Sequence, residues 1–488
     1  MSLRSRSRKV SVAALVAWAM LATLSMNYLF LSPPNAKVTS RSSIVGQPSH
    51  RGSLRATSLN SGGCRWRYSL SALGFIALLG VAARAALRKA FPYFDDQELT
   101  YLDSAATSHK PQVVIDAMDD FYCNTNSNVH RSAHVAAERA TEALENSRET
   151  MARFIGADGI GGLVITSGAT DGLNRLAGMA SRNGLLKDGK VLITEMDHHS
   201  NILPWSTACE RTQMVKVDPL TGEIDMEDLS RKLDKEVKIV AFVHVSHVTG
   251  HEADVEGIRR LVRSKAPNAL IVLDCTQSVP HQKIDVDELG VDAIVFSAHK
   301  MFGPTGVGVL WLSDRALREL PLPATNGGGS LEDIDCDTLK IRYTPPPWRY
   351  EPGTPPLAEA VGMARAADFV MDHRNEIKQH EDELLSLTLD EVSKIPCNIL
   401  GGDEASRGAP IVSMTFNGVY PNDVGTIASG LRGVCVRAGH HCAIPFHRAM
   451  GEEGSLRLSL GPYNTSEDVK KGVDAIAEAL DIISDENH

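Results

Sequence analysis

Residues 269–300 contain two apolar runs, Ala269-Leu-Ile-Val-Leu273 and Val291-Asp-Ala-Ile-Val-Phe296, and polar residues follow each run directly. Short runs rich in Ile and Val predict strands that are buried on both faces, as in a parallel sheet. Open α/β sheets bind ligands beyond the carboxyl ends of their strands. The polar residues after these two runs are therefore the first candidates for a ligand site.

These polar residues suit one cofactor in particular. Asp274 and Gln277 follow the first run, and Ser297-Ala298-His299-Lys300 closes the second. Pyridoxal phosphate requires a lysine for its Schiff base and an acid that faces its pyridinium nitrogen. Lys300 and Asp274 satisfy this pairing, although the same residues are also compatible with ordinary loop polarity after two strands.

Apolar runs alternate with amphipathic stretches along the chain from Leu99 onward. This alternation predicts a mostly parallel sheet that is covered by helices on both faces. The run from Gly306 to Leu312 follows Lys300 too closely for a helical crossover, so we expect it to be antiparallel to its predecessor. The predicted strands are residues 163–166, 190–194, 237–244, 269–273, 293–296 and 306–312, and the predicted helices are residues 135–154, 172–181 and 255–264.

A Pro-rich connection, residues 345–356, divides the body of the chain into two domains. A long helix from Pro356 to about Ser393 then leads into a segment that has strands and helices of its own. We expect a large domain over residues 95–365 and a smaller C-terminal α/β domain over residues 366–488. The predicted strands of the small domain are residues 409–417 and 433–437, and its predicted helices are residues 423–431 and 466–483.

Residues 1–94 differ in composition from the rest of the chain. They contain no Asp or Glu but thirteen Lys and Arg, whereas the whole chain has a formal net charge of -10. The remainder therefore carries a charge of about -23. Such an acidic body argues against nucleic acid as the main partner.

The order of segments within residues 1–94 indicates a targeting presequence. A basic start precedes an apolar segment over residues 10–31, a Ser- and Arg-rich stretch follows, and a second apolar segment spans residues 68–87. A signal-like segment followed by a transit-like segment resembles the bipartite presequences of algae with complex plastids, so we expect a plastid location. Import into a mitochondrion and retention as a membrane anchor remain open, because each apolar segment is long enough to cross a bilayer. Membrane contact is expected only through this extension, if it is retained.

The eight cysteines show no Cys-x-x-Cys pair and no Cys/His ligand spacing. We therefore expect neither a metal site nor a disulfide framework. Cys442 differs from the others because it lies in a Gly- and His-bearing loop, where His440 and His441 could lower the pKa of the thiol or relay a proton. Cys435 alternates with valines like a strand residue, and we expect it in the core.

Two further loops follow predicted strands. The turn from Ser167 to Gly172 precedes a helix, and its small residues would let backbone N–H groups and the helix N-terminus approach a phosphate. The turn does not match the Gly-x-Gly-x-x-Gly pattern of dinucleotide sites. His198 follows the strand at residues 190–194, and an imidazole placed there can stack on a pyridine ring.

The order of these segments, together with Arg437-Ala-Gly-His-His-Cys-Ala-Ile-Pro445, resembles the SufS-type (group II) cysteine desulfurases. These belong to the class V aminotransferase family of fold-type I pyridoxal phosphate enzymes. Their fold implies a mostly parallel seven-stranded sheet with helices on both faces and a smaller C-terminal α/β domain. The resemblance extends from about Tyr101 to the C-terminus, and it includes residues 101–106, 129–131 and 327–330.

The resemblance implies a role for each candidate residue at the cofactor. Lys300 would be the Schiff-base lysine, and Asp274 would face the pyridinium nitrogen. Gln277 would bond the ring oxygen, and His198 would stack on the ring. The residues that would hold the phosphate are Ala169, Thr170, Ser297 and His299, and Thr354 would reach the phosphate of the neighbouring subunit in a two-fold homodimer.

The implied reaction converts L-cysteine to L-alanine. Lys300 would move the Cα proton, and the Cys442 thiolate would attack the substrate sulfur and become a persulfide. Arg457 would bind the substrate carboxylate, for which a guanidinium offers two parallel donors. The persulfide would pass to a SufE-like acceptor and then to a SufBCD-type scaffold for iron–sulfur cluster assembly.

The chain departs from the family pattern near the predicted ring. His247 stands where the family commonly has Asn, which puts the fine contacts to the substrate in doubt. Two other functions remain open: a selenocysteine lyase, which shares the cofactor site, and an inactive, membrane-tethered interaction subunit. The presence of Lys300, Asp274 and Cys442 argues against an inactive subunit.

Overall fold

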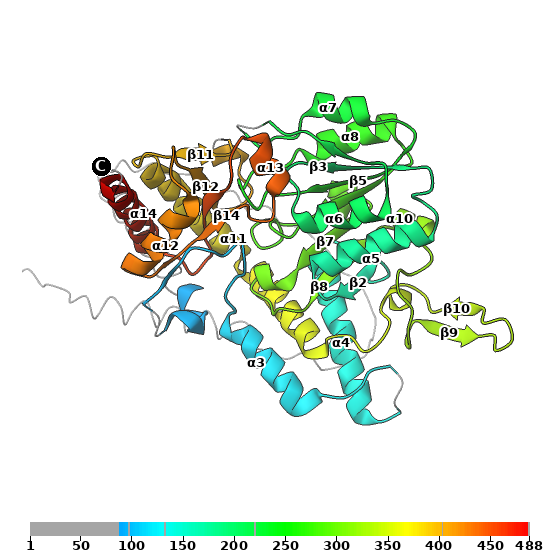
Figure 1. Ribbon diagram of the computed structural model, residues 1–488. Coiled ribbons are helices and arrows are strands. Elements are labelled where there is room, and N and C mark those ends of the chain that lie inside the picture. The colour runs from blue at the N-terminus through cyan, green and yellow to red at the C-terminus, as the bar shows by residue number, and fades with distance from the viewer. Residues whose placement is uncertain (1–86, 96–97, 131–132, 219–220, 403, 487–488) are drawn as a thin grey trace, which may run out of the picture. The chain divides into compact units, whose positions relative to one another are not determined.

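The computed structural model describes residues 87–488, except for 96–97, 131–132, 219–220, 403 and 487–488 (Figure 1). The first predicted apolar segment, residues 10–31, lies outside this range, and so does the second up to residue 86. Within the described part of the chain, no helix is both long and apolar enough to cross a membrane.

The large domain is built on a seven-stranded sheet with the strand order β2-β8-β7-β6-β5-β3-β4. Only β8 runs against the others, because it pairs antiparallel with both of its neighbours. The prediction of a mostly parallel seven-stranded sheet is therefore confirmed. The strands are β2 (Leu163–Thr166), β3 (Lys190–Thr194), β4 (Thr212–Val215), β5 (Val237–Val243), β6 (Leu270–Asp274), β7 (Ala293–Ser297) and β8 (Gly308–Leu312).

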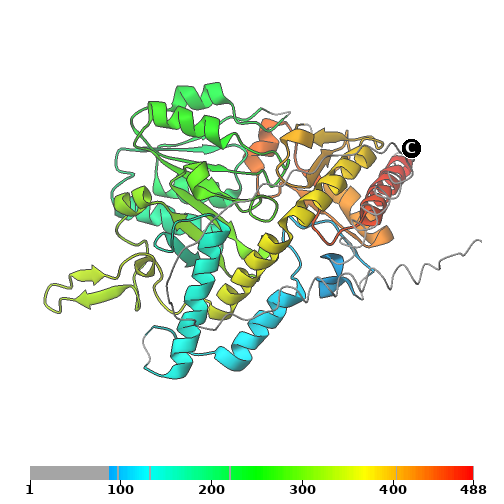
Figure 2. The same cartoon turned by 180° about the vertical axis from the view of Figure 1, so that it is seen from behind.

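Helices cover both faces of this sheet, and the sheet lies between two apolar clusters (Figures 1 and 2). Successive residues of one strand point to opposite faces. In β5, Ile239 enters one cluster and Val240 enters the other. Helices α4, α8 and α11 pack on the Val240 side, and α5, α6 and α10 pack on the Ile239 side. The helices of this domain are α3 (Gln112–Asp120), α4 (Val135–Phe154), α5 (Ala169–Arg182), α6 (His199–Ala208), α7 (Met226–Lys232), α8 (Val255–Lys265), α9 (Val286–Leu289) and α10 (Asp314–Glu319).

The small domain follows α11 (Leu357–Val392), which runs from one domain to the other (Figures 1 and 2). Its antiparallel sheet has the order β11-β12-β15-β14. A short parallel pair joins β1 (Thr100–Tyr101) to β13 (Val434–Cys435), so the start of the body packs with the small domain. The other elements are β11 (Asn398–Leu400), β12 (Ile411–Thr415), α12 (Pro421–Arg432), β14 (Arg437–Gly439), α13 (Ile444–Ala449), β15 (Ser455–Ser459) and α14 (Ser466–Glu486).

The residues just before position 95 belong to the folded body. The ring of Phe91 is fully buried and makes edge-on contacts with the rings of Phe302, Phe369 and Tyr463 at centroid distances of 5.7, 5.7 and 5.0 Å. Burial of one such side chain contributes about 1.5–3 kcal/mol to folding. The sequence assigned residues up to 94 to the extension, yet Leu87 and Phe91 lie in the core of the large domain.

A two-stranded hairpin projects from the large domain between β8 and α11 (Figure 2). It consists of β9 (Leu331–Ile334) and β10 (Ile341–Tyr343), which pair antiparallel. Its side chains are half-buried or exposed. The Pro-rich segment that follows the hairpin contains the 3-10 helix η4 (Trp348–Tyr350) and leads to Thr354.

Candidate active site

The carboxyl ends of β6 and β7 meet at one cavity of about 210 Å³. Asp274 ends β6, Ser297 ends β7, and Lys300 lies in η3 (Ala298–Lys300), the single 3-10 turn after β7. Nine of the predicted site residues line this cavity, namely Ala169, Thr170, His198, His247, Asp274, Gln277, Ser297, His299 and Lys300. Sequence reasoning missed five other lining residues: Ala106, Ser200, Val243, Thr276 and Arg437.

The turn between β2 and α5 forms one wall of the cavity. Gly168 has a φ of +144°, and a Cβ at this residue would lie 3.1 Å from the Ser297 hydroxyl, so the position requires glycine. The N–H of Ala169 donates to Ser297 Oγ at 2.8 Å, and the hydroxyls of Thr170 and Ser200 lie 2.8 Å apart. The N-terminus of α5 and two hydroxyls therefore face the space that a phosphate would occupy.

Asp274 and Gln277 form the floor of the site. The N–H of Thr276 donates to Asp274 Oδ1 at 3.0 Å. Burial raises the pKa of Asp274, while the contact with Thr276 and the charge of Lys300 oppose that shift. Gln277 is 2 % exposed, and its Nε2 donates to the carbonyl of Ala105 at 2.8 Å. The carboxylate is thus fixed at the end of its strand, where it can face a pyridinium nitrogen.

Lys300 has the electrostatic properties of a nucleophilic lysine. Burial and the charges of Arg457 and Arg437 lower its pKa to about 8, although Asp274 and the Cys442 thiol act in the opposite direction. A lysine with this pKa is partly neutral at physiological pH, and the neutral amine attacks a carbonyl.

We predict that the Lys300 amine reacts with a limiting amount of acetic anhydride half-maximally near pH 8 in the protein freed of cofactor. A lowered pKa means that the amine loses its proton at lower pH than the ordinary value of 10.5, so reactivity appears earlier on a rising pH scale. Peptide mass spectrometry over a pH series measures this midpoint. Asp274→Asn should move it to lower pH, because the carboxylate stabilises the cation. A wild-type midpoint above pH 10 would contradict the prediction.

The His198 ring is neutral and oriented. Its Nδ1 accepts from the N–H of Ser200 at 3.1 Å, so the imidazole begins α6 as a helix cap. Burial and the nearby charge of Lys300 lower the pKa of His198 to about 3. Its ring contacts His247 edge-on at a centroid distance of 4.9 Å. A neutral, fixed ring suits the predicted stacking role.

Arg457 is buried in the middle of β15 and is held from two sides. It is 2 % exposed, its Nη1 donates to the carbonyl of His247 at 2.7 Å, and its Nη2 donates to Asp103 Oδ1 at 3.0 Å. The Nε is buried without a partner. Burial lowers the pKa of Arg457, and Asp103 opposes that shift. Asp103 lies in the quoted stretch 101–106, but nothing in its local sequence pointed to an arginine 354 positions away.

His247 fills the space between His198 and Arg457. It is 4 % exposed, and its Nε2 has no hydrogen-bond partner. Burial, followed by the proximity of His198 and Lys300, lowers the pKa of His247 well below its ordinary value. The imidazole is therefore a neutral group with an unused nitrogen on the wall of the cavity.

Cys442 lies in a strained loop between β14 and α13. Both His441 and Cys442 have positive φ values, +50° and +62°, in a region that side-chain-bearing residues rarely adopt. The N–H of His199 donates to the Cys442 carbonyl at 2.8 Å, and the N–H of Ile444 donates to His199 Nε2 at 3.2 Å. These contacts hold the loop against the start of α6. Strain that the surroundings maintain is a feature of functional sites.

The sequence suggested that His441 could lower the pKa of the Cys442 thiol, but His441 carries no positive charge. Its Nε2 lies 3.0 Å from the carbonyl of Ser455, and burial lowers its pKa to about 2. The ring is therefore neutral and packed beneath the loop. The cations of the site are instead Lys300, Arg437 and Arg457. Arg437 opens the quoted stretch 437–445, which was the only sequence signal for it.

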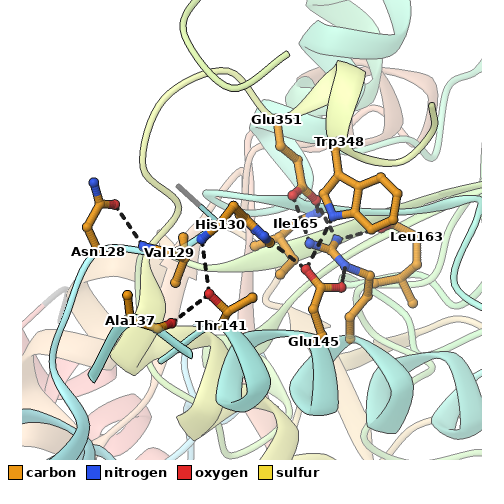
Figure 3. A network of polar contacts seen from close by, with 11 residues as sticks. Asn128, Val129, His130, Ala137, Thr141, Glu145, Leu163, Ile165, Trp348 and Glu351 are labelled. Atoms are coloured by element: carbon orange, nitrogen blue, oxygen red, sulfur yellow. Dashed lines mark hydrogen bonds and ion pairs between the residues drawn. The ribbon is translucent and has the colours of Figure 1, made fainter. Parts of the chain in front are cut away.

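Thr354 does not reach the Lys300 cavity within one chain. It lines a separate cavity of about 440 Å³ together with His130, Gly328, Gly329 and Trp348. The surroundings of that cavity are shown in Figure 3. Within one chain, Thr354 therefore lies apart from the residues that line the Lys300 cavity.

The residues of the Lys300 cavity fit pyridoxal phosphate. A lysine, a buried carboxylate, a neutral histidine ring and a helix N-terminus each face the same space. One buried polar atom on its wall, His247 Nε2, has no partner of its own and can serve a polar ligand. Among the described residues, no group of three or more His, Cys, Asp or Glu side chains is placed to hold a metal ion.

Comparisons with known proteins agree with this geometry. The sequence pattern of the class-V aminotransferases matches residues 100–471. A probable cysteine desulfurase of Halalkalibacterium halodurans is 38% identical over 403 residues, which cover 81% of this chain and 96% of the relative. A probable cysteine desulfurase of Streptomyces coelicolor is 36% identical over 413 residues, which cover 82% of this chain and 97% of the relative.

Solved structures of cysteine desulfurases are also similar to this chain. The apo structure of the cysteine desulfurase of Thermococcus onnurineus has a TM-score of 0.74 and 32% identity, and covers 81% of this chain and 97% of its own. The cysteine desulfurase CsdA of Escherichia coli, in an S-sulfonic acid form, has a TM-score of 0.73 and 29% identity, and covers 82% of this chain and 98% of its own. The chain therefore belongs to the aminotransferase class-V family, and it is a fold-type I enzyme that depends on pyridoxal phosphate.

Proposed function

We propose that the protein is a cysteine desulfurase that removes sulfur from L-cysteine, releases L-alanine and holds the sulfur as a persulfide on Cys442. The observation that carries this proposal is the position of the thiol. Cys442 is held in a strained loop whose backbone bonds to His199 at the start of α6, next to His198 on the wall of the Lys300 cavity. Cysteine desulfurases are also among the relatives most similar in sequence and structure.

Each side chain of the site has a separate role in the proposed reaction. Arg457 binds the substrate carboxylate with the donors that His247 and Asp103 leave unused. Bound pyridoxal phosphate withdraws electrons from the substrate Cα, and Asp274 supports this by facing the ring nitrogen. Lys300, with a pKa of about 8, takes the Cα proton as a base and returns it as an acid.

The sulfur transfer is a displacement at the substrate sulfur. The Cys442 thiolate attacks that atom, a sulfur–sulfur bond forms, and the bond between the substrate sulfur and Cβ breaks. The electron pair of the broken bond remains on the carbon fragment, which takes a proton and leaves as alanine. The neutral side chains of His198 and His247 line the reaction space without adding charge to it.

The proposal is tested by incubating the full chain with L-cysteine and, separately, with L-selenocysteine, and measuring alanine in both. A desulfurase produces alanine from cysteine, with a persulfide on Cys442, whether or not it also acts on selenocysteine. Alanine from selenocysteine alone would replace the proposal with the selenocysteine lyase.

We propose further that two copies form a homodimer in which each Thr354 serves the cofactor of the partner. This is supported by the separation between the Thr354 cavity and the Lys300 cavity within one chain.

We propose that the persulfide on Cys442 then passes to a SufE-like acceptor and a SufBCD-type scaffold for iron–sulfur cluster assembly. The similarity of residues 437–445 to SufS-type enzymes supports this route.

For location we propose a plastid, reached through a bipartite presequence. Support comes from the absence of acidic residues over positions 1–94 and from the two apolar segments, 10–31 and 68–87. Sequencing the N-terminus of the protein from its native compartment tests this. A start within about ten residues of Leu87 is expected, because Leu87 is already part of the core. A start before residue 68 would contradict complete removal of the presequence.

A further inference from the structure

The segment that carries Thr354 is anchored by a buried ion pair between Glu351 and Arg148 of α4. The guanidinium donates two bonds to the carboxylate, Nη1 to Oε1 at 2.6 Å and Nη2 to Oε2 at 2.9 Å. The Arg148 side chain is fully buried, and that of Glu351 is 7% exposed. Burial of such a pair is costly unless all of its polar atoms are bonded.

The remaining polar atoms of the pair bind the outer edge of β2. Arg148 Nη1 also donates to the carbonyl of Leu163 at 2.9 Å, and the N–H of Ile165 donates to Glu351 Oε1 at 2.6 Å. β2 is the edge strand of the large sheet, so these backbone groups have no neighbouring strand to bond. The ion pair supplies the hydrogen bonds that a neighbouring strand would otherwise make to Leu163 and Ile165.

β2 leads directly into the turn that faces the phosphate site. A second chain of contacts joins the same two regions, because Arg175 Nη1 donates to the carbonyl of Tyr350 at 2.8 Å while its Nε donates to Asp171 at 2.9 Å. Asp171 in turn accepts from the N–H of Ser167 at 2.9 Å. Two sets of hydrogen bonds therefore connect the segment 350–354 to the turn between β2 and α5 of its own chain.

The opposite side of the ion pair reaches the cavity that Thr354 lines. Glu145 Oε2 accepts from Arg148 at 3.1 Å, and its Oε1 accepts from Trp348 Nε1 at 3.2 Å. His130 Nε2 lies 3.6 Å from the same Oε1. His130, Glu145, Trp348 and Glu351 thus form one polar network at the wall of the Thr354 cavity (Figure 3).

We propose that Glu351 is a positioning residue for two cofactor sites at once: the site of its own chain, through β2, and the site of the partner, through Thr354. This inference rests on the homodimer of the proposed function. Thr354 itself touches only the partner's site. Loss of Glu351 is therefore expected to weaken both sites of a dimer, whereas loss of Thr354 weakens one.

The test uses mixed dimers of the full chain, in which one wild-type subunit and one variant subunit carry different tags and are purified through both. Each dimer is loaded with pyridoxal phosphate and diluted into a scavenger of the free cofactor, and loss of the bound absorbance is followed. With Glu351→Gln in one subunit, the entire amplitude should decay about tenfold faster than in wild type. With Thr354→Ala in one subunit, only half of the amplitude should accelerate.

The chain offers a matched control at the start of the central strand β6. Arg263 donates to the carbonyl of Ala269 at 2.7 Å and to Asp292 at 2.7 Å, and the N–H of Ile271 donates to Asp292 at 2.8 Å. The Arg263–Asp292 pair bonds backbone groups at the start of β6, as the Glu351 pair does in β2. It lies at the opposite end of its strand from the cofactor site. Asp292→Asn should leave cofactor release unchanged. If the Glu351→Gln chain does not fold, Glu351→Asp, which keeps the charge but withdraws the carboxylate, takes its place.

The possible outcomes separate this inference from the proposed function. Acceleration of half the amplitude by Glu351→Gln, or a rate equal to that of Asp292→Asn, overturns the double role of Glu351 and leaves the function intact. Equal effects of Thr354→Ala on both sites overturn the exchange of Thr354 between subunits. Failure of the wild-type chain to bind pyridoxal phosphate overturns the proposed function, and this inference with it.

Discussion

Replacement of Cys442 by alanine is expected to lower the rate of alanine formation from cysteine by about three orders of magnitude or more, because the variant lacks the thiol proposed to accept the sulfur. The visible absorbance of the bound cofactor should remain, since Cys442 lines neither the phosphate turn nor the floor of the site. Alanine is quantified over a time course at saturating cysteine, and persulfide is measured by alkylation and mass spectrometry.

The matched control for this variant is Cys435→Ala. Cys435 lies in β13, seven residues before Cys442, and is half-buried beside β1. Its loss should change the rate by less than about twofold, because removing this sulfur atom leaves the backbone pairing of β13 with β1 intact. Cysteine turnover by Cys442→Ala at the wild-type rate would remove the thiol from the mechanism.

Replacement of Lys300 by alanine is expected to eliminate the absorbance band near ~420 nm that a lysine-bound pyridoxal phosphate gives, and to reduce turnover by about three orders of magnitude or more. Lys300 is the lysine whose amine faces the cavity, and its lowered pKa prepares it for attack on the cofactor carbonyl. Absorbance spectra and alanine assays of the two purified proteins measure both effects.

Lys283→Ala serves as the control for the loss of a lysine. Its side chain is 64% exposed and pairs with Asp285 at the surface, so its removal should leave the band and the rate unchanged. A Lys300→Ala protein that retains the band at full intensity would show that another amine holds the cofactor.

The sequence pattern predicted the central strands of the large sheet because they are continuously apolar. β6 and β7 lie within one residue of the predicted ranges, and the antiparallel direction of β8 followed from its short connection. β4 escaped prediction because Thr212-Gln-Met-Val215 mixes polar and apolar residues at the edge of the sheet. An edge strand does not need the continuous apolarity that marks a central one.

The sequence predicted those residues of the candidate site that lie at strand ends or within a recognisable motif. Lys300 and Asp274 follow strands that are neighbours in the sheet, so sequence reasoning could pair them. The contact between Arg457 and Asp103 joins opposite ends of the body, and no local pattern indicates it. The bond between Arg148 and Glu351, residues 203 positions apart, escaped notice for the same reason.

The sequence also could not predict the charge states of the buried histidines. His441 and His198 were candidates for charged or stacking roles by residue type alone, but burial beside arginine and lysine makes both rings neutral. The shift depends on how much solvent each ring loses on folding and on which cations surround it. Both quantities follow from tertiary structure.

The most direct test of the proposed chemistry is to mix the loaded wild-type protein with one equivalent of L-cysteine and to map the added sulfur by mass spectrometry without reductant. We expect one additional sulfur atom on the peptide that contains Cys442, accompanied by one molecule of alanine for each sulfur. Alanine formed with no added sulfur on that peptide, or sulfur found on another cysteine, would contradict the assignment of Cys442 as the sulfur acceptor.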